Sequence, residues 1–213
     1  MRYLIVCGGK IDKEFGLNEI KTDGIDAIIA ADSGMDFLYE NSVTPDIIVG
    51  DFDSATTKAL EFFERKGQTE IHRLNPIKDD TDTEYAIRLA ISEGARSIVM
   101  LGATGSRIDH VLGNISLLGI GLESKTDISI IDTNNRIRMA DKPVTIEKSA
   151  QYGRFVSLIA VTDDNEVSLR GFKYPVTDYS FDRFTSLGIS LSLIHIRAHE
   201  TLANLVCRLL LEK

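Results

Sequence analysis

The first 125 residues alternate short apolar runs with loops that contain glycine or aspartate. Apolar runs of this length, bounded by turn residues, are typical of buried strands, and the segments between several of them carry apolar residues at helical spacing. We expect strands at residues 3–7, 26–31, 47–49, 70–74 and 97–101, and helices at 35–39, 55–66, 81–94 and 108–118. This alternation predicts an α/β fold with a mostly parallel sheet flanked by helices.

The last two of these helices have the clearest sequence signals. Thr81 and Glu84 have the spacing of a capping box, in which a hydroxyl and a carboxylate satisfy backbone N–H groups at a helix start. From Ile108 to Leu118, apolar residues recur at positions i, i+3, i+4, i+7 and i+10. That period predicts an amphipathic helix.

Beyond residue 125 the pattern changes to short strand candidates with no long helix between them. We expect these strands at residues 127–131, 136–140, 144–147, 155–161 and 166–172, separated by turn residues. The sequence therefore predicts a smaller all-β, sandwich-like domain over residues 126–190, after an α/β domain over residues 1–125.

Composition and charge narrow the class of protein. The 213 residues are 43% hydrophobic and 26% charged, as in ordinary globular domains, and the formal net charge is −8. A negative net charge argues against non-specific binding of nucleic acid. Two cysteines, Cys7 and Cys207, form neither a disulfide framework nor a zinc site. No apolar run is long enough to span a membrane or form a signal-peptide core, so we expect a cytoplasmic protein without a membrane partner.

The strongest candidate chemistry follows the third strand, at Asp51 and Asp53. Residues i and i+2 of an extended chain point the same way, so both carboxylates can leave the strand end while Phe52 turns into the core. Paired carboxylates suit Mg²⁺, which leaves its other positions to water and phosphate. The alternative for an isolated pair is an acidic turn that caps the next helix.

Other polar loops fall at the same edge of the predicted sheet. Ligands of such sheets bind beyond the carboxyl ends of the strands. Asp32 follows the second strand, an acidic run at 79–82 follows the fourth, and the segment 102–110 follows the fifth. Acidic loops at three places on one edge favour a metal site over separate solvated turns. The Gly8-Gly9 pair after the first strand is interpreted as a plain tight turn.

Four segments in this order resemble the thiamine pyrophosphokinase (thiamine diphosphokinase) family. They are Ala31-Asp32-Ser33-Gly34, Pro45-Asp46 through Gly50-Asp51-Phe52-Asp53-Ser54, Lys78-Asp79-Asp80-Thr81-Asp82, and Gly102-Ala103-Thr104-Gly105-Ser106-Arg107-Ile108-Asp109-His110. The resemblance covers roughly residues 1–190. Ser33 and Ser106 stand where many relatives have glycine.

The resemblance implies transfer of a diphosphate group from ATP to the hydroxyl of thiamine, with release of AMP. It also implies Mg²⁺ as cofactor and a homodimer that holds thiamine at the subunit interface. Asp51, Asp53 and Asp82 would be the metal carboxylates, and Asp32 would ligate metal or orient thiamine.

The resemblance also implies a nucleotide side of the site. Arg107 begins a helix after two glycines, where N–H groups and a guanidinium both favour phosphate; its alternative is a local salt bridge. Lys78 reaches a phosphate or balances Asp79 and Asp80, and one of those two aspartates is plain solvated charge. Asp109 binds nucleotide or caps its own helix, and His110 is interpreted as a packed or capping residue. The remaining candidates for ligand contact are Thr81, Gly102, Thr104 and Gly105, with Ser190 on the thiamine side.

The chain departs from the family pattern after Ser190. Residues 191–196 read Leu-Ser-Leu-Ile-His-Ile, which a transposon end used in sequencing-library preparation encodes in one frame. We therefore interpret residues 191–213 as a non-native tail. The alternative is a divergent helical tail, because Leu202, Leu205, Val206, Leu209 and Leu210 follow a helical pattern.

Two other functions compete with the kinase. A catalytically silent module that binds nucleotide or metal is favoured by the altered carboxyl terminus. A nucleotide-sugar transferase that uses the Asp51-Phe52-Asp53 motif is disfavoured by the loops at 79–82 and 102–110.

Overall fold

The computed structural model describes residues 1–53, 55–75, 80–105, 107–163, 165–192 and 210–212. The chain divides into two compact units, residues 1–133 and 134–213. Among the described residues, no helix is both long and apolar enough to cross a membrane.

The first unit is built on a parallel sheet. Its strands are β1 (Arg2–Val6), β2 (Ala27–Ala31), β3 (Ile47–Gly50), β4 (Glu70–Arg73), β5 (Ser97–Leu101) and β6 (Asp127–Ile131), in the order β6-β5-β1-β2-β3-β4. The chain moves outward from β1 to β4 and then returns to the other side of β1. The order therefore reverses between β1 and β5, which is where sheets of this type place a ligand. The predicted α/β fold class is confirmed.

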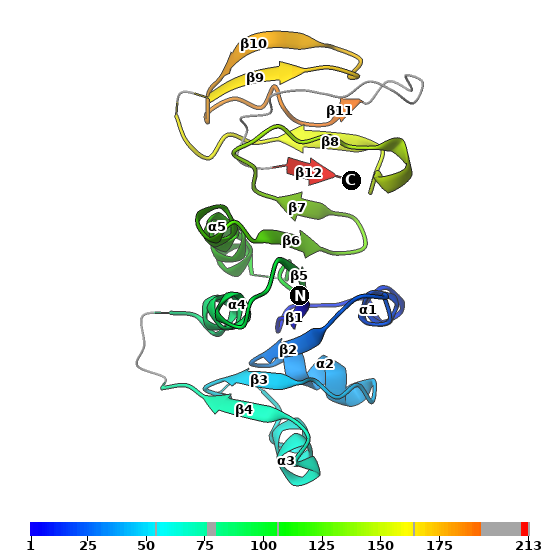
Figure 1. Ribbon diagram of the computed structural model, residues 1–213, viewed down its shortest axis with the longest axis vertical. Helices are drawn as coiled ribbons and strands as arrows, with labels where there is room; N and C mark the ends of the chain where they lie inside the picture. Colours follow the sequence, from blue (N-terminus) through cyan, green and yellow to red (C-terminus); the bar gives the residue numbers. More distant parts are fainter. Residues whose placement is uncertain (54, 76–79, 106, 164, 193–209, 213) are drawn as a thin grey trace. The chain divides into compact units, whose positions relative to one another are not determined.

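Helices cover both faces of this sheet (Figure 1). They are α1 (Lys13–Ile20), α2 (Gly34–Glu40), α3 (Thr57–Lys66), α4 (Asp82–Ser92) and α5 (Ile108–Ser124). Figure 1 shows α1 and α2 on one side of the strands and α4 and α5 on the other. Helix α1 was not predicted, because Gly16 interrupts its helical pattern. A Cβ at that glycine would lie 2.6 Å from the Ile11 side chain and 2.7 Å from the Phe37 ring, so close packing requires it.

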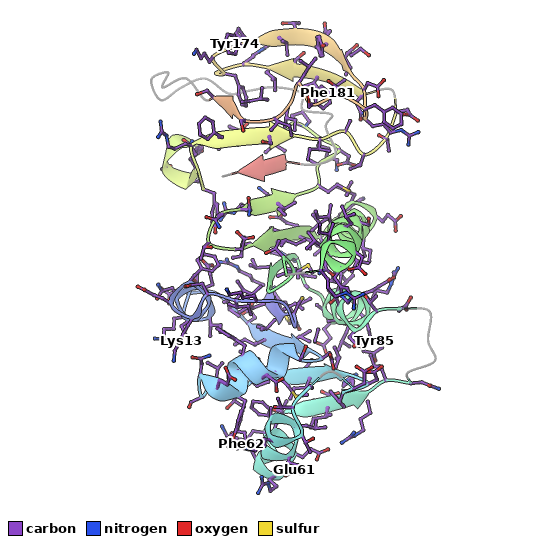
Figure 2. The ribbon with its side chains drawn as sticks, turned by 180° about the vertical axis from the view of Figure 1, so that it is seen from behind. Lys13, Glu61, Phe62, Tyr85, Tyr174 and Phe181 are labelled. Atoms are coloured by element: carbon purple, nitrogen blue, oxygen red, sulfur yellow. The ribbon has the colours of Figure 1, made fainter. Side chains whose placement is uncertain are left out.

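The core of the first unit lies between the sheet and the helices. Strand residues such as Leu4, Ile48 and Leu101 are at most 1% exposed, which is why the strands read as continuous apolar runs. Figure 2 labels Phe62 of α3 near the outer end of the sheet. Its ring packs edge to face with that of Tyr39 of α2, with ring centroids 5.2 Å apart. Aromatic packing of this kind fixes α3 against α2.

The second unit is antiparallel. Its strands are β7 (Arg136–Arg138), β8 (Phe155–Leu158), β9 (Asn165–Leu169), β10 (Val176–Phe181), β11 (Leu191–Ser192) and β12 (Leu210–Glu212), and a short 3₁₀ turn, η1, spans Lys148–Ala150. Strands β11, β8, β12 and β7 lie side by side, and β9 and β10 form a hairpin. Val156, Leu158, Val167, Leu169 and Phe181 are among the buried residues of its own core.

Several expectations for the second half differ from the structure. Residues 127–131, grouped by their sequence with the second domain, pair in parallel with β5 as β6. Residues 144–147 do not form a strand. Val144 and Ile146 pack on the core of the second unit without pairing to another strand. The alternating apolar pattern there reflects burial of these two side chains. Strand β10 was not predicted, because most of its side chains are exposed.

The end of the chain also differs from its pattern. Residues 210–212 form β12 between β7 and β8 rather than continuing a helix, because pairing with two distant strands outweighs local periodicity. The rest of the predicted helical tail, residues 193–209, lies outside the described residues. The non-native origin of residues 191–213 stays a prediction.

Candidate active site

Three aspartates converge at the carboxyl ends of β2 and β3. Asp32 follows β2, and Asp51 and Asp53 follow β3; a carboxylate oxygen from each lies within 4.8 Å of the other two. The register of the sheet brings the two loops together, because the Asp32 N–H donates to the carbonyl of Val49 at 2.7 Å. We call Asp32, Asp51 and Asp53 the acidic group.

The backbone at the acidic group adopts an uncommon conformation that directs its side chains. Asp32 has a φ of 46° and Phe52 a φ of 66°, in the left-handed region that L residues other than glycine seldom adopt. The Phe52 ring packs against the core, and the Arg73 guanidinium lies 5.3 Å from its centroid. The Asp53 N–H donates to Asp51 Oδ1 at 3.2 Å. The phenylalanine thus points inward while the two carboxylates flank it.

The electrostatics of the acidic group favour a cation. Burial raises the pKa of Asp32 above its ordinary value, and the negative charges of Asp82, Asp51 and Asp53 add to that effect. Asp32 Oδ1 is buried without a hydrogen-bond partner in the described part of the chain. A buried carboxylate oxygen beside two further carboxylates is costly unless positive charge is added. Oxygen donors at this spacing fit a hard cation such as Mg²⁺.

Asp82 lies in the first turn of α4 and acts on Asp32 through its charge. The resemblance grouped Asp82 with Asp51 and Asp53. In the structure, the third carboxylate within 4.8 Å of those two is Asp32. Thr81 caps the same helix, its hydroxyl accepting from the Glu84 N–H at 3.2 Å. The Glu84 carboxylate accepts from Arg88 at 2.6 Å. One half of the predicted capping box is therefore present.

A second loop region meets the site at the switch between β1 and β5. The Gly9 N–H donates to the Gly102 carbonyl at 2.9 Å. A Cβ at Gly9 would lie 2.3 Å from that carbonyl oxygen, and Gly102 has a φ of 68°. The loops after β1 and β5 therefore approach closely at Gly9 and Gly102, where the structure leaves no room for a side chain at Gly9. The glycine pair after β1 thus permits this close approach in addition to turning the chain.

The loop after β5 is held by side chains on both sides. The Thr104 hydroxyl donates to Asp132 Oδ2 at 2.7 Å, and the Asn114 amide of α5 donates to the Ala103 carbonyl at 2.8 Å. Asp132 and Asn114 were not identified from the sequence. Neither stands in a chemical motif, and their partners become visible only once β6 and α5 are in place.

Arg107 and Asp109 form an ion pair at the start of α5. Arg107 Nη2 lies 2.7 Å from Asp109 Oδ2, and Arg107 Nε donates to Oδ1 at 3.2 Å. Their side chains are 69% and 65% exposed, so the pair is well solvated. The hydrogen bond from Arg107 lowers the pKa of Asp109 to about 2. The local salt bridge expected as an alternative role is present, and its exposure leaves the guanidinium open to exchange with another anion.

The remaining candidates lie elsewhere. The His110 backbone N–H donates to Asp109 Oδ1 at 2.9 Å. Ser190 lies in the second unit with a φ of 58°, and its N–H donates to Ser157 Oγ at 2.9 Å. Asp80 is exposed, and Lys78 and Asp79 lie outside the described residues.

Comparisons with known proteins agree across the chain. The family model "Thiamin pyrophosphokinase, catalytic domain" matches residues 21–131, and "Thiamin pyrophosphokinase, vitamin B1 binding domain" matches residues 143–194. Thiamine pyrophosphokinase of Bacillus subtilis is 36% identical over 171 residues, 79% of each chain.

Solved structures give the same result. A crystal structure of thiamine pyrophosphokinase from Bacillus subtilis superposes with a TM-score of 0.82 at 31% identity, covering 99% of this chain and 97% of that one. A thiamin pyrophosphokinase from Geobacillus thermodenitrificans superposes with a TM-score of 0.77 at 27% identity, covering 99% and 95%.

Proposed function

This chain belongs to the thiamin pyrophosphokinase family, and from that premise we propose that it transfers the terminal diphosphate of ATP to the hydroxyl of thiamine, releasing AMP. The family makes thiamine diphosphate from thiamine, with ATP as co-substrate. The single observation that carries the proposal is the convergence of Asp32, Asp51 and Asp53 within 4.8 Å at the ligand-binding edge of the sheet.

The proposed reaction is one displacement at phosphorus. The thiamine hydroxyl oxygen forms a bond to the β-phosphorus of ATP, the bond from that phosphorus to the α,β-bridging oxygen breaks, and AMP leaves with the oxygen. The hydroxyl proton passes to solvent or to a basic group. Such transfers need alignment and neutralisation of charge more than covalent help from the protein.

The acidic group has the chemistry to hold Mg²⁺. Asp51, Asp53 and Asp32 would supply carboxylate oxygens, and Asp32 Oδ1 is buried with no hydrogen-bond partner among the described residues. Asp82 adds negative charge from α4 and is retained as a further ligand candidate. When bound, the cation would neutralise phosphate oxygens and orient the transferred group.

The loop after β5 supplies the opposite charge. Backbone N–H groups at the start of α5 favour anionic oxygens. Arg107 would exchange Asp109 for a phosphate, because a phosphate offers the guanidinium two oxygens and more charge than one solvated carboxylate. Gly102 and Gly105 keep side chains out of this loop, and the Thr104 hydroxyl fixes it to Asp132. Lys78 and Thr81 are retained as candidate contacts.

The proposal includes a homodimer in the cytoplasm, with thiamine bound partly by the second unit through residues near Ser190. The vitamin B1 binding family model over residues 143–194 supports a role of this unit in thiamine recognition. Light scattering on the purified full chain tests the dimer, for which we expect twice the chain mass.

The test of the activity is formation of AMP from ATP, measured by chromatography with each component omitted in turn. We expect AMP and thiamine diphosphate in equal amounts, only when thiamine and Mg²⁺ are both present. ADP with thiamine monophosphate would contradict diphosphate transfer. A second protein carries the corresponding residues of the Bacillus subtilis relative in place of residues 191–213. If both proteins bind ATP but neither forms AMP, a silent nucleotide-binding module would be favoured.

A further inference from the structure

Two side chains outside the acidic group fasten the loop that carries Asp51 and Asp53. Thr56 is the N-cap residue of α3, at the far end of that loop. Its hydroxyl donates to Asp36 Oδ1 at 2.5 Å. Its backbone N–H lies 3.2 Å from Asp36 Oδ1 and 3.1 Å from Oδ2. We call this set of contacts the Asp36–Thr56 clamp.

The clamp joins the two chain segments that form the acidic group. Asp36 lies in the first turn of α2, four residues after Asp32. At the start of the loop, the Asp32 N–H is bonded to the Val49 carbonyl at 2.7 Å. The segment from β3 to α3 is therefore attached to the Asp32 segment at both of its ends, by backbone before Asp51 and by a carboxylate after Asp53.

The two attachments oppose charge repulsion within the acidic group before a cation binds. Three carboxylates with oxygens within 4.8 Å of one another repel, and that repulsion acts to separate Asp51 and Asp53 from Asp32. Asp36 opposes that separation because its carboxylate accepts from both the hydroxyl and the backbone N–H of Thr56. The same carboxylate satisfies an N–H at the start of α3, which Thr56 does not cap with its own side chain.

We propose that Asp36 and Thr56 are positioning residues for cation binding, whose hydrogen bonds hold Asp51 and Asp53 beside Asp32. This inference rests on the proposed function, because it takes the acidic group to be the cation site. Neither residue needs to touch the cation or a substrate. Partners that orient metal ligands commonly change metal affinity by ~10- to 100-fold when they are removed.

The experiment measures binding of Mn²⁺, as a spectroscopic substitute for Mg²⁺, to the full chain without nucleotide. Electron paramagnetic resonance reports the free ion. We expect Thr56→Ala and Asp36→Asn each to weaken Mn²⁺ binding about 10-fold, in the range expected for a ligand-orienting partner. Thr56→Ser keeps the hydroxyl, so its affinity should stay within about twofold of the starting protein, since the hydrogen bond is retained.

Asp46→Asn is the matched control. Asp46 Oδ2 accepts from the Ile28 N–H at 2.7 Å. This carboxylate-to-backbone hydrogen bond lies at the amino-terminal end of β3, whereas the acidic group lies at the carboxyl-terminal end. This variant should lower the melting temperature without changing Mn²⁺ affinity, which separates a general loss of stability from a loss of positioning.

The outcomes distinguish the clamp from the site that it serves. Failure of the starting protein to bind Mn²⁺ would overturn the proposed cation site. Tight binding by the starting protein together with equal affinity in Asp36→Asn and Thr56→Ala would overturn the clamp alone. Asp36→Asn preserves side-chain volume but removes the negative charge and replaces one of the two acceptor oxygens with an amide group, so it remains a test if Thr56→Ala does not fold.

In the enzyme assay, the same variants should raise the Mg²⁺ concentration needed for half-maximal rate about 10-fold. Their rate at saturating Mg²⁺ should remain close to that of the starting protein, since a saturating cation restores the geometry. A fall in that maximal rate with unchanged Mg²⁺ dependence would contradict a positioning role.

Discussion

The acidic group after β2 and β3 and the Arg107 loop after β5 lie at the same edge of one parallel sheet, yet their charges are arranged in opposite ways. In the acidic group, like charges are brought together, and a buried oxygen of Asp32 has no partner in the described chain. In the Arg107 loop, opposite charges are paired in the open, at 2.7 Å. The first region gathers charges of one sign, while the second pairs opposite charges.

The difference indicates what each region is able to bind. The pKa of Asp32 is raised mainly by burial, a cost that an added cation would reverse. The pKa of Asp109 is lowered to about 2 by Arg107, and both side chains are solvated, so the pair can separate at low cost. In the proposed function, a metal–polyphosphate complex would add positive charge at the first region and would offer Arg107 a more highly charged partner in the second.

The largest expected effect follows from removing a carboxylate of the acidic group. Asp53→Asn should lower the rate of AMP formation about 10²- to 10³-fold, because metal stabilisation of the transferred group amounts to several kcal/mol and each ~1.4 kcal/mol is tenfold. Chromatography of AMP measures it. Asp23→Asn, an exposed residue in the turn before β2, is the control and should leave the rate unchanged.

The Asp53→Asn protein should also fold normally, since the substitution relieves repulsion rather than creating it. A folded Asp53→Asn protein with full turnover would show that the acidic group does not serve catalysis.

The next effect concerns the Arg107 loop. Arg107→Ala should lower kcat/KM for ATP about 10- to 100-fold, the range for one charge-assisted hydrogen-bonded contact of ~1.5–3 kcal/mol. Arg107→Lys should recover only part of the loss, because an ammonium lacks the guanidinium fork. Steady-state kinetics at saturating thiamine measure both variants.

A variant of Asp109 distinguishes phosphate binding by Arg107 from a structural role of the Arg107–Asp109 ion pair. If the guanidinium exchanges its partner for phosphate, Asp109→Asn frees it and should not reproduce the loss seen in Arg107→Ala. Equal losses in the two variants would mean that the Arg107–Asp109 pair acts as a structural unit.

A smaller effect is expected on stability, with a defined dependence on pH. The pKa of Asp32 is raised in the folded state, so its favourable contribution is present below the unfolded pKa of about 3.9 and is lost as pH rises through the folded pKa. Asp32→Asn should therefore raise the melting temperature at pH 7 by a few degrees, on the order of 2–4 °C per kcal/mol for a chain of this size.

Melting curves across pH test this prediction. The stabilisation by Asp32→Asn should shrink as pH falls toward 4, and Mg²⁺ should stabilise the unsubstituted protein more than the variant. A stabilisation independent of pH would contradict the electrostatic explanation.

The comparison also explains what the sequence was able to reveal about the fold. Buried parallel strands have continuous apolar sequences, so the expected positions of β1, β2, β3 and β5 agree closely with the structure. Helix α1 was not predicted, because Gly16 interrupts the helical spacing of its apolar residues. The close approach of the Phe37 ring leaves no room for a side chain at that position. In the second unit, alternation at Val144 and Ile146 reflected burial without strand pairing.

For the site, the spacing of Asp51 and Asp53 was informative because it depends only on the local chain. The close approach of Asp32 depends on the pairing of β2 with β3, and the partners Asp36 and Asp132 depend on how distant elements pack. The spacing of residues in the sequence does not give the distance between side chains on different helices and strands, so these contacts were not predicted.

The most direct test of the account is a crystal structure of the full chain with Mn²⁺ and the α,β-methylene analogue of ATP, which cannot undergo the proposed cleavage. The account predicts an anomalous Mn²⁺ peak at about 2.0–2.3 Å from carboxylate oxygens of Asp51 and Asp53. It also predicts phosphate oxygens bonded to Arg107, with the Asp109 contact broken. A cation bound away from the acidic group, or an unbroken Arg107–Asp109 pair beside bound nucleotide, would contradict it.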